Sequence, residues 1–388
     1  MRSSTALFIG ALLLASAGAN VAVAANAPQT TAAASAAQEG AAETARINAW
    51  FDAKYEEQLD LSPMARSYAG EKKDYDKIDD MSEEAADRAL EWQRKSVEEL
   101  RAKFDRAKLP PDAQLSYDLW IYQYEDAASL APFRRNDYVF NQLYGPHTRI
   151  PQFLMQIHRV DEPADMDAYI ARISGVARAQ LQLLDIAKKN AAAGSRVPRF
   201  SYETMIPQAR ALITGAPFAG EGNSAVWTDL QTKVEGLVKA GKIDAAKAEA
   251  YKAAGRKALL DRWKPSFDQV IAWFESEAPK ADAVATGVGK NPNGKAYYEA
   301  MLASSTTTGL TAQQVHQIGL DEVARIKGEM EQIKRQVGFK GTLQEFFKFV
   351  REDDRFYYPN TDAGRQAYID SATAHIAFMK QQLPKYFG

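Results

Sequence analysis

Apolar residues recur every three or four positions along most of this sequence, and no other feature constrains its fold as strongly. The longest such series contains Val315, Gly319, Val323, Ile326, Met330, Ile333 and Val337. A helix with 3.6 residues per turn places those positions on one face, which is expected to pack along one side. No convincing alternation of apolar and polar residues, typical of a half-buried strand, is present. The pattern predicts a mostly α fold, a multi-helix array of long amphipathic helices joined by irregular loops, with at most minor β structure.

Capping and breaking residues predict several element boundaries. A Thr-x-x-Gln box at 311–314 and a Thr-x-x-Glu box at 342–345 each predict a helix start, because their side chains satisfy free backbone N–H groups. A helical stretch over 243–277 is expected to bend near Pro265. The glycine-rich segment 220–223 is expected to be a flexible link.

The N-terminus has the pattern of a secretory signal peptide over residues 1–24. A basic residue at position 2 precedes an apolar run over 6–17, and Ala-Val-Ala at 22–24 supplies the cleavage pattern. The run is shorter than the roughly 20 apolar residues that span a bilayer. The remainder is expected to be a disordered leader over 25–40 and one helical domain over 41–388. The mature protein is therefore predicted to be periplasmic or secreted, with no membrane attachment after signal cleavage.

Charge and cysteine content exclude several classes of protein. Lys and Arg number 48 against 50 Asp and Glu, which gives a formal net charge of −2 and no reason to expect nucleic acid as a partner. Cysteine is absent, so disulfides, thiolate nucleophiles and cysteine-ligated zinc are excluded. The four histidines form no His-x-x-x-His pair. We predict no metal ligand and no catalytic residue in this chain.

For each candidate residue, a structural role is an alternative to a functional one. His316 stands in the first turn of the helix that starts at 311–314, where it would either contact a substrate or lie partly buried beside the apolar stripe. His147 and His158 lack a second ligand at helical spacing. Adjacent acids such as Asp353 and Asp354 are typical of solvated surfaces, although a hydrolase with two carboxylates would also need such groups.

Several motifs together resemble the DUF885 family of bacterial proteins. The most specific is the series Gly294-Lys295-Ala296-Tyr297-Tyr298, Thr306-Thr307-Thr308-Gly309-Leu310-Thr311 and Val315-His316-Gln317-Ile318-Gly319-Leu320. Shorter matches are Leu61-Ser62-Pro63, Gln142-Leu143-Tyr144-Gly145-Pro146, Ile150-Pro151-Gln152-Phe153-Leu154, Phe339-Lys340-Gly341 and Leu383-Pro384-Lys385-Tyr386-Phe387-Gly388. The resemblance covers essentially the whole chain after the signal peptide.

Members of that family are similar to helical zinc metallopeptidases with a deep cleft, and they are considerably longer than this chain. Their zinc segment, a His-Glu stretch that ends in Pro-Gly-His-His, has no counterpart here. The resemblance implies the N-terminal helical part of an exported zinc-dependent peptidase-like hydrolase that forms one wall of the substrate cleft. Zinc is then expected only in the full-length protein, and this chain alone is expected to be inactive. His316, Tyr297 and Tyr298 become candidate substrate contacts.

The alternative is a non-catalytic periplasmic binding or scaffold protein that is complete as given. Such a protein needs no metal and no acid–base pair, and an apolar groove would bind a peptide. Either reading expects a peptide or small-molecule partner, and neither predicts an oligomeric state. The ending at Leu383-Pro384 and Tyr386-Phe387 favours the first, because exposed aromatics at a terminus are typical of a chain that continues.

Overall fold

The computed structural model describes residues 31–387 and confirms the mostly α prediction. Its α-helices are α1 (Thr31–Asp60), α2 (Pro63–Tyr68), α3 (Glu83–Lys103), α4 (Pro111–Leu130), α5 (Pro146–Gln156), α6 (Pro163–Ala192), α7 (Arg199–Ala211), α8 (Ala225–Lys239), α9 (Ala245–Ala258), α10 (Lys264–Glu277), α11 (Gly294–Thr306), α12 (Ala312–Gln336), α13 (Leu343–Glu352) and α14 (Asp362–Gln382). Short 3₁₀ turns are η1 (Arg106–Lys108), η2 (Ala131–Asn136), η4 (Ala278–Lys280), η5 (Val288–Lys290), η6 (Asp354–Phe356) and η7 (Leu383–Lys385). No helix in the described part is long and apolar enough to cross a membrane.

The N-terminal predictions meet the structure only in part. The predicted signal peptide over 1–24 and positions 25–30 of the predicted leader lie outside the described residues. From Thr31 the backbone is already helical, so α1 begins ten positions before the expected start of the helical domain at 41. The alanine-rich sequence over 31–42 accounts for this difference, since alanine has the highest helix propensity.

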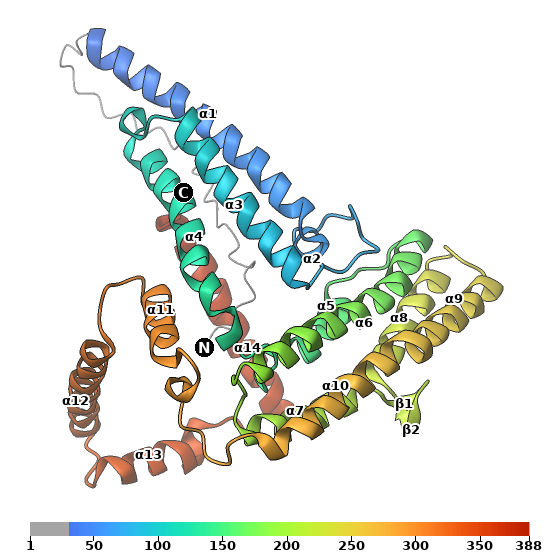
Figure 1. The fold of residues 1–388 in the computed structure, drawn as a ribbon. Helices are drawn as coiled ribbons and strands as arrows, with labels where there is room; N and C mark the ends of the chain where they lie inside the picture. The colour runs from blue at the N-terminus through green and yellow to red at the C-terminus, as the bar shows by residue number, and fades with distance from the viewer. Residues whose placement is uncertain (1–30, 388) are drawn as a thin grey trace. The chain divides into compact units, whose positions relative to one another are not determined.

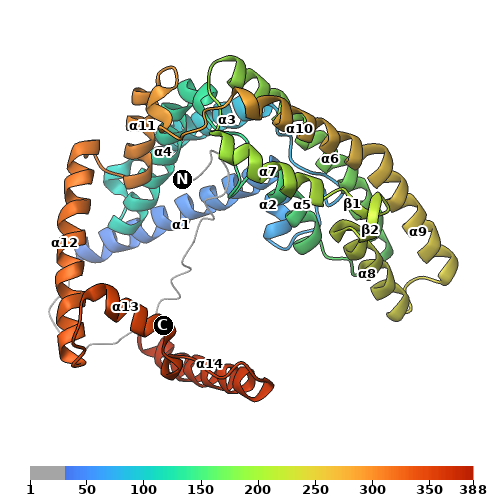
Figure 2. The same ribbon diagram turned by 90° about the horizontal axis from the view of Figure 1, so that it is seen from below.

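The described chain divides into two compact units, which we call the first unit (to Thr307) and the second unit (from Thr308). In the first unit, α1, α3 and α4 pack on a small core that contains Ile47, Leu100 and Tyr117 (Figure 1). Helices α5 to α10 surround a larger core. Figure 2 shows α6 running alongside α9 and α10. The two cores explain why the first unit holds its shape without cysteine.

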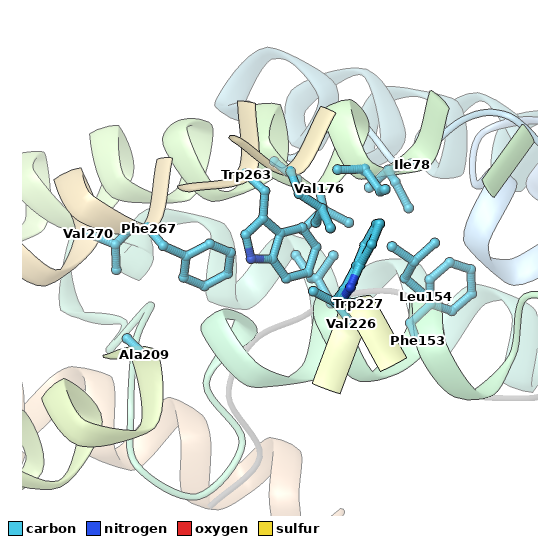
Figure 3. Packing of buried hydrophobic residues seen from close by; sticks show 14 of the residues in the cluster. Ile78, Phe153, Leu154, Val176, Ala209, Val226, Trp227, Trp263, Phe267 and Val270 are labelled. Carbon is cyan, nitrogen blue, oxygen red and sulfur yellow. The ribbon is translucent and has the colours of Figure 1, made fainter. Parts of the chain in front are cut away.

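A π-helix, η3 (Leu259–Trp263), joins α9 to α10 where the sequence predicts a bend. Leu259 and Trp263 are fully buried. The Trp263 ring lies 5.0 Å from the ring of Phe267, beside Val176 of α6 (Figure 3). Proline at position 265 falls within the first turn of α10, where its missing N–H is tolerated. A wider helical turn therefore lies where the sequence predicts a bend, directly before the segment that contains Pro265.

The segment predicted as a flexible link is instead part of a small parallel sheet. Strand β1 (Thr214–Ala216) pairs with β2 (Ala219–Asn223). The sheet is irregular because Gly215, Gly220 and Gly222 have positive φ angles of 85°, 108° and 72°. Sequence periodicity misses such strands, since all five residues of β2 are exposed and have no apolar alternation.

The second unit contains α12, α13 and α14. Both predicted capping boxes are present, with Thr311 accepting from the N–H of Gln314 and Thr342 from that of Glu345. The expectation that the α12 stripe packs along one side is wrong for the described residues. Among its members, Val323 is 51% exposed and Ile333 51% exposed. A 3.6-residue period identifies the face that a helix would bury, but it does not supply the partner that covers it.

Two glycines in neighbouring helices should respond oppositely to substitution with alanine. A Cβ at Gly236 of α8 would meet nothing within 4 Å, whereas a Cβ at Gly255 of α9 would lie 2.2 Å from Cδ1 of the fully buried Leu230. G236A should raise the free energy of unfolding by about 0.5–1 kcal/mol through helix propensity. G255A should lower it by about 1 kcal/mol, because overpacking outweighs the same gain. Urea unfolding of both variants tests this, and equal signs would contradict it.

Candidate functional site

Tyr297 and Tyr298 lie in α11, in the first unit. The helix starts at Gly294, where an added Cβ would lie 2.0 Å from the carbonyl oxygen of Val288, so glycine is required there. Tyr297 is half-buried, with its ring 6.0 Å from that of Phe133, and Tyr298 is 45% exposed. Burial and the neighbouring carboxylate of Asp137 raise the pKa of Tyr297 to about 12. Its hydroxyl therefore stays protonated and can donate a hydrogen bond.

Asp137 is the residue near Tyr297 that sequence reasoning missed. Its half-buried carboxylate accepts from the N–H of Tyr138, and burial raises its pKa to about 6. Asn291 Nδ2 donates to the Tyr138 hydroxyl over 3.1 Å, which ties this segment to the start of α11. A carboxyl whose pKa is about 6, beside the phenol of Tyr297, can exchange a proton with a bound molecule. The sequence carries no signal for this, because the burial of Asp137 depends on contacts with residues some 150 positions away.

His316 lies in the first turn of α12, in the second unit. Its side chain is exposed, so the alternative of a partly buried histidine beside the stripe is not what the structure shows. Val315 next to it is half-buried. The three candidate contacts therefore fall in different units, Tyr297 and Tyr298 in the first and His316 in the second. Within the first unit, α11 brings Tyr297 close to Asp137.

The two buried histidines, His147 and His158, form hydrogen bonds within the core. His158 Nε2 donates to the carbonyl of Asp165 over 2.9 Å, so Nδ1 accepts from Arg172 Nη1, also over 2.9 Å. His147 Nε2 lies 3.1 Å from Gln208 Oε1. Burial lowers the pKa of each histidine to about 4. Both rings are therefore neutral at physiological pH and serve as hydrogen-bonding parts of the core.

The described residues contain no group of three or more His, Asp or Glu side chains that would hold a metal ion. Asp353 pairs with Arg355 over 2.8 Å at an exposed position, and this ion pair lowers the pKa of Asp353. That shift is opposite to what a general acid requires. The adjacent acids at 353–354 therefore have the character of a solvated surface.

An open groove of about 900 Å³ crosses the first unit. One wall is the exposed face of α6, which includes Arg178 and Leu181, and the opposite wall is η3 with the start of α10. The first turn of α3, at Glu83 and Glu84, also lines the groove. Its volume lies within the range of roughly 300–1,000 Å³ that is usual for small-molecule sites. The groove is lined by polar and charged side chains over a partly apolar floor that includes Ile186.

Residues 63–388 match the family described as "Bacterial protein of unknown function (DUF885)". The chain belongs to the DUF885 family. The match covers most of the helical part of this DUF885 chain, from α2 onward, and it confirms the family resemblance of the tyrosine and His316 motifs. A comparison with curated proteins finds no significant match.

A solved structure, "The crystal structure of the putative lipoprotein from Colwellia psychrerythraea", is similar in fold. The TM-score is 0.68 at 17% sequence identity, and the alignment covers 90% of this chain. At that identity the likeness concerns the fold alone. The DUF885 chain spans 59% of the length of that relative.

Proposed function

We propose that this DUF885 chain is the N-terminal helical part of an exported, zinc-dependent, peptidase-like hydrolase, in which it forms one wall of the substrate cleft. The uncovered apolar surface of the second unit carries the proposal. Its exposed members include Ile318, Val323, Ile333, Ile376 and Phe378. Many exposed apolar side chains on helices are typical of an interaction surface, so we propose that further polypeptide packs on them. Coverage of 59% of the Colwellia relative supports this expectation.

The zinc site of such a hydrolase does not fit the described residues. They contain no three-residue ligand group, and both buried histidines are engaged in the core. The ligands would therefore come from polypeptide outside this chain. The proposed contribution of this chain is substrate binding, by the protonated hydroxyl of Tyr297 and the exposed Tyr298 in the first unit. The exposed imidazole of His316 in the second unit is proposed separately as a substrate contact. Asp137, whose pKa is raised to about 6, would accept or release a proton beside Tyr297.

Export is the second part of the proposal. It is supported by the signal-peptide pattern over 1–24. The structural relative is described as a lipoprotein, which is compatible with export. The expected location is the periplasm or the medium, and the expected substrate is a peptide.

The first test is the intact mass of the native protein, captured from its host. A mass well above that of residues 25–388, with bound zinc and peptide hydrolysis that residues 25–388 lack, is expected. In that longer protein, Y297F should lower kcat/KM about tenfold through one lost hydrogen bond to substrate, with zinc content unchanged. Y122F removes an exposed phenol from α4 and should have no effect. A longer protein without hydrolysis, or equal activity of Y297F and wild type, would contradict the proposal.

A non-catalytic binding protein is the second candidate. It is favoured by one observation, the groove on the first unit, because binding there needs no metal. A native mass that matches residues 25–388, together with peptide binding and no hydrolysis, would favour this candidate over the hydrolase.

A further inference from the structure

The groove on the first unit is built from three separate stretches of sequence, and a π-helix forms part of one wall. Asp261 and Arg262 of η3 line the groove, while Leu259 and Trp263 of the same turn are buried beneath it. Single π-turns within helices occur frequently at functional sites. This placement turns two charged side chains toward the groove while the aromatic side of the same helix stays in the core.

Most of the charged side chains along the groove already have partners. Lys189 Nζ lies 3.0 Å from Glu83 Oε2 and 2.7 Å from Asp185 Oδ2. Asp261 pairs with Lys257. These groups neutralise one another, so they give the groove polarity without a strong net charge. A polyanion such as a nucleic acid therefore has no complementary surface here.

Two groove side chains of opposite charge, Glu84 and Arg262, lack such partners in the described part of the chain. Within residues 31–387, neither the carboxylate of Glu84 nor the guanidinium of Arg262 has an ion pair or a hydrogen bond. Arg178, by contrast, donates to the backbone carbonyls of Ile78 and Asp79. Glu84 also lies in the first turn of α3, where a negative charge favours the helix. One acid and one base thus remain available to a ligand.

We infer that this groove binds short peptides with free termini, with the ammonium on Glu84 and the carboxylate on Arg262. An unblocked peptide offers one charge of each sign, amide groups for Ser174 and Gln269, and apolar side chains for Leu181. Charged hydrogen bonds of this kind contribute more than neutral ones. The inference stands on the residues of the first unit alone, so it does not depend on hydrolysis or on zinc.

The test is calorimetric titration of the full chain with a tetrapeptide of alanine and leucine, in free, N-acetylated and C-amidated forms. Each cap should raise Kd about tenfold. E84Q should raise Kd about tenfold for the free peptide and leave the N-acetylated peptide unaffected. R262Q should raise Kd about tenfold for the free peptide and leave the Kd of the C-amidated peptide unaffected.

Matched controls separate this site from general effects of charge. E203Q and R256Q remove an exposed acid and an exposed base outside the groove and should leave Kd unchanged. Thermal unfolding of all four variants verifies that each is folded. Absence of saturable binding would overturn the inference, as would equal affinity for free and capped peptides or unchanged affinity in both E84Q and R262Q. Loss of hydrolysis in the native protein would leave the inference standing, which keeps its failure distinct from that of the proposed function.

Discussion

Replacing Arg172 with alanine should lower the free energy of unfolding of the first unit by about 4 kcal/mol. Arg172 is fully buried in α6. Its guanidinium donates to the carbonyl of Lys77 over 2.9 Å, to Ser67 Oγ over 2.6 Å and to His158 Nδ1 over 2.9 Å. It also stacks 4.6 Å from the ring of Tyr75. One side chain therefore holds α2, the loop that follows it and the segment after α5 against α6.

Two effects oppose each other in this substitution. No carboxylate lies within hydrogen-bonding distance of Arg172 in the described structure, so removing the buried charge relieves a desolvation cost. The substitution also opens a cavity and leaves three acceptors without this donor, of which the buried Ser67 hydroxyl and His158 ring cost about 1–3 kcal/mol each. We expect the cost of the cavity and of the unpaired acceptors to exceed the desolvation energy that is relieved. R172M fills much of the cavity but leaves the same acceptors without a donor, so it should cost about 3 kcal/mol.

Thermal unfolding measures the difference. A loss of about 4 kcal/mol should lower Tm by roughly 10 °C in a unit of this size. Arg178 provides the matched control, because it is exposed on the same helix and also donates to the loop at Ile78 and Asp79. R178A should cost less than about 1 kcal/mol. If R172A and R178A unfold at the same temperature, the structural role assigned to Arg172 is wrong.

Acidification from pH 6.5 to pH 4 should destabilise the first unit, chiefly through His147 and His158. Their pKa values are about 4 in the folded state and about 6.5 in an unfolded chain. The unfolded state therefore binds more protons in this window, so stability is fully present above pH 6.5 and is lost as pH falls. At roughly 1.4 kcal/mol per unit, each histidine accounts for a loss on the order of 3 kcal/mol by pH 4.

Asp137 changes the stability in the opposite direction as the pH falls. Its folded pKa of about 6 lies above its ordinary value, so the folded state takes up the proton first and gains stability as pH falls from about 6 to 4. The net loss between pH 6.5 and pH 4 should then be close to that of one histidine, about 3 kcal/mol. Urea unfolding at several pH values should show a shallower slope in H158Q and a steeper loss in D137N.

The exposed histidines of the second unit supply the control. H316Q and H375Q make the same substitution at exposed positions and are the controls for the substitution itself. The same slope in wild type and H158Q would show that the buried imidazole does not control acid unfolding. A shallower slope in D137N would reverse the sign assigned to Asp137.

The helices of this protein could be predicted because their signals are local. The boxes at Thr311 and Thr342 identify two helix starts, and the spacing of apolar residues identifies α12 in full. The π-turn at 259–263 was expected only as a bend, since nothing in the sequence distinguishes a wider turn from a proline kink. The sheet at 214–223 was missed, because its glycines resemble a linker and its partner strand is only three residues long.

The candidate site was predictable only where a family motif exists. Tyr297, Tyr298 and His316 stand in such motifs, but which of them lie together depends on the fold. Asp137 stands in an irregular aromatic segment, and its proton affinity arises from burial that no local pattern reports. The groove likewise needs α3, α6 and α10 brought together, which no single stretch of sequence encodes.

The π-turn also has a consequence for how the chain length can vary. α9 packs on α8, whereas α10 packs on α7, and both contact α6. An α-helix turns about 100° per residue, so the extra residue in η3 determines which side of α10 faces α7 and which side of α9 faces α8. Deleting one residue between Leu259 and Trp263 would rotate all of α10 away from α7. The contacts of α10 with α7 therefore allow only one chain length at this point.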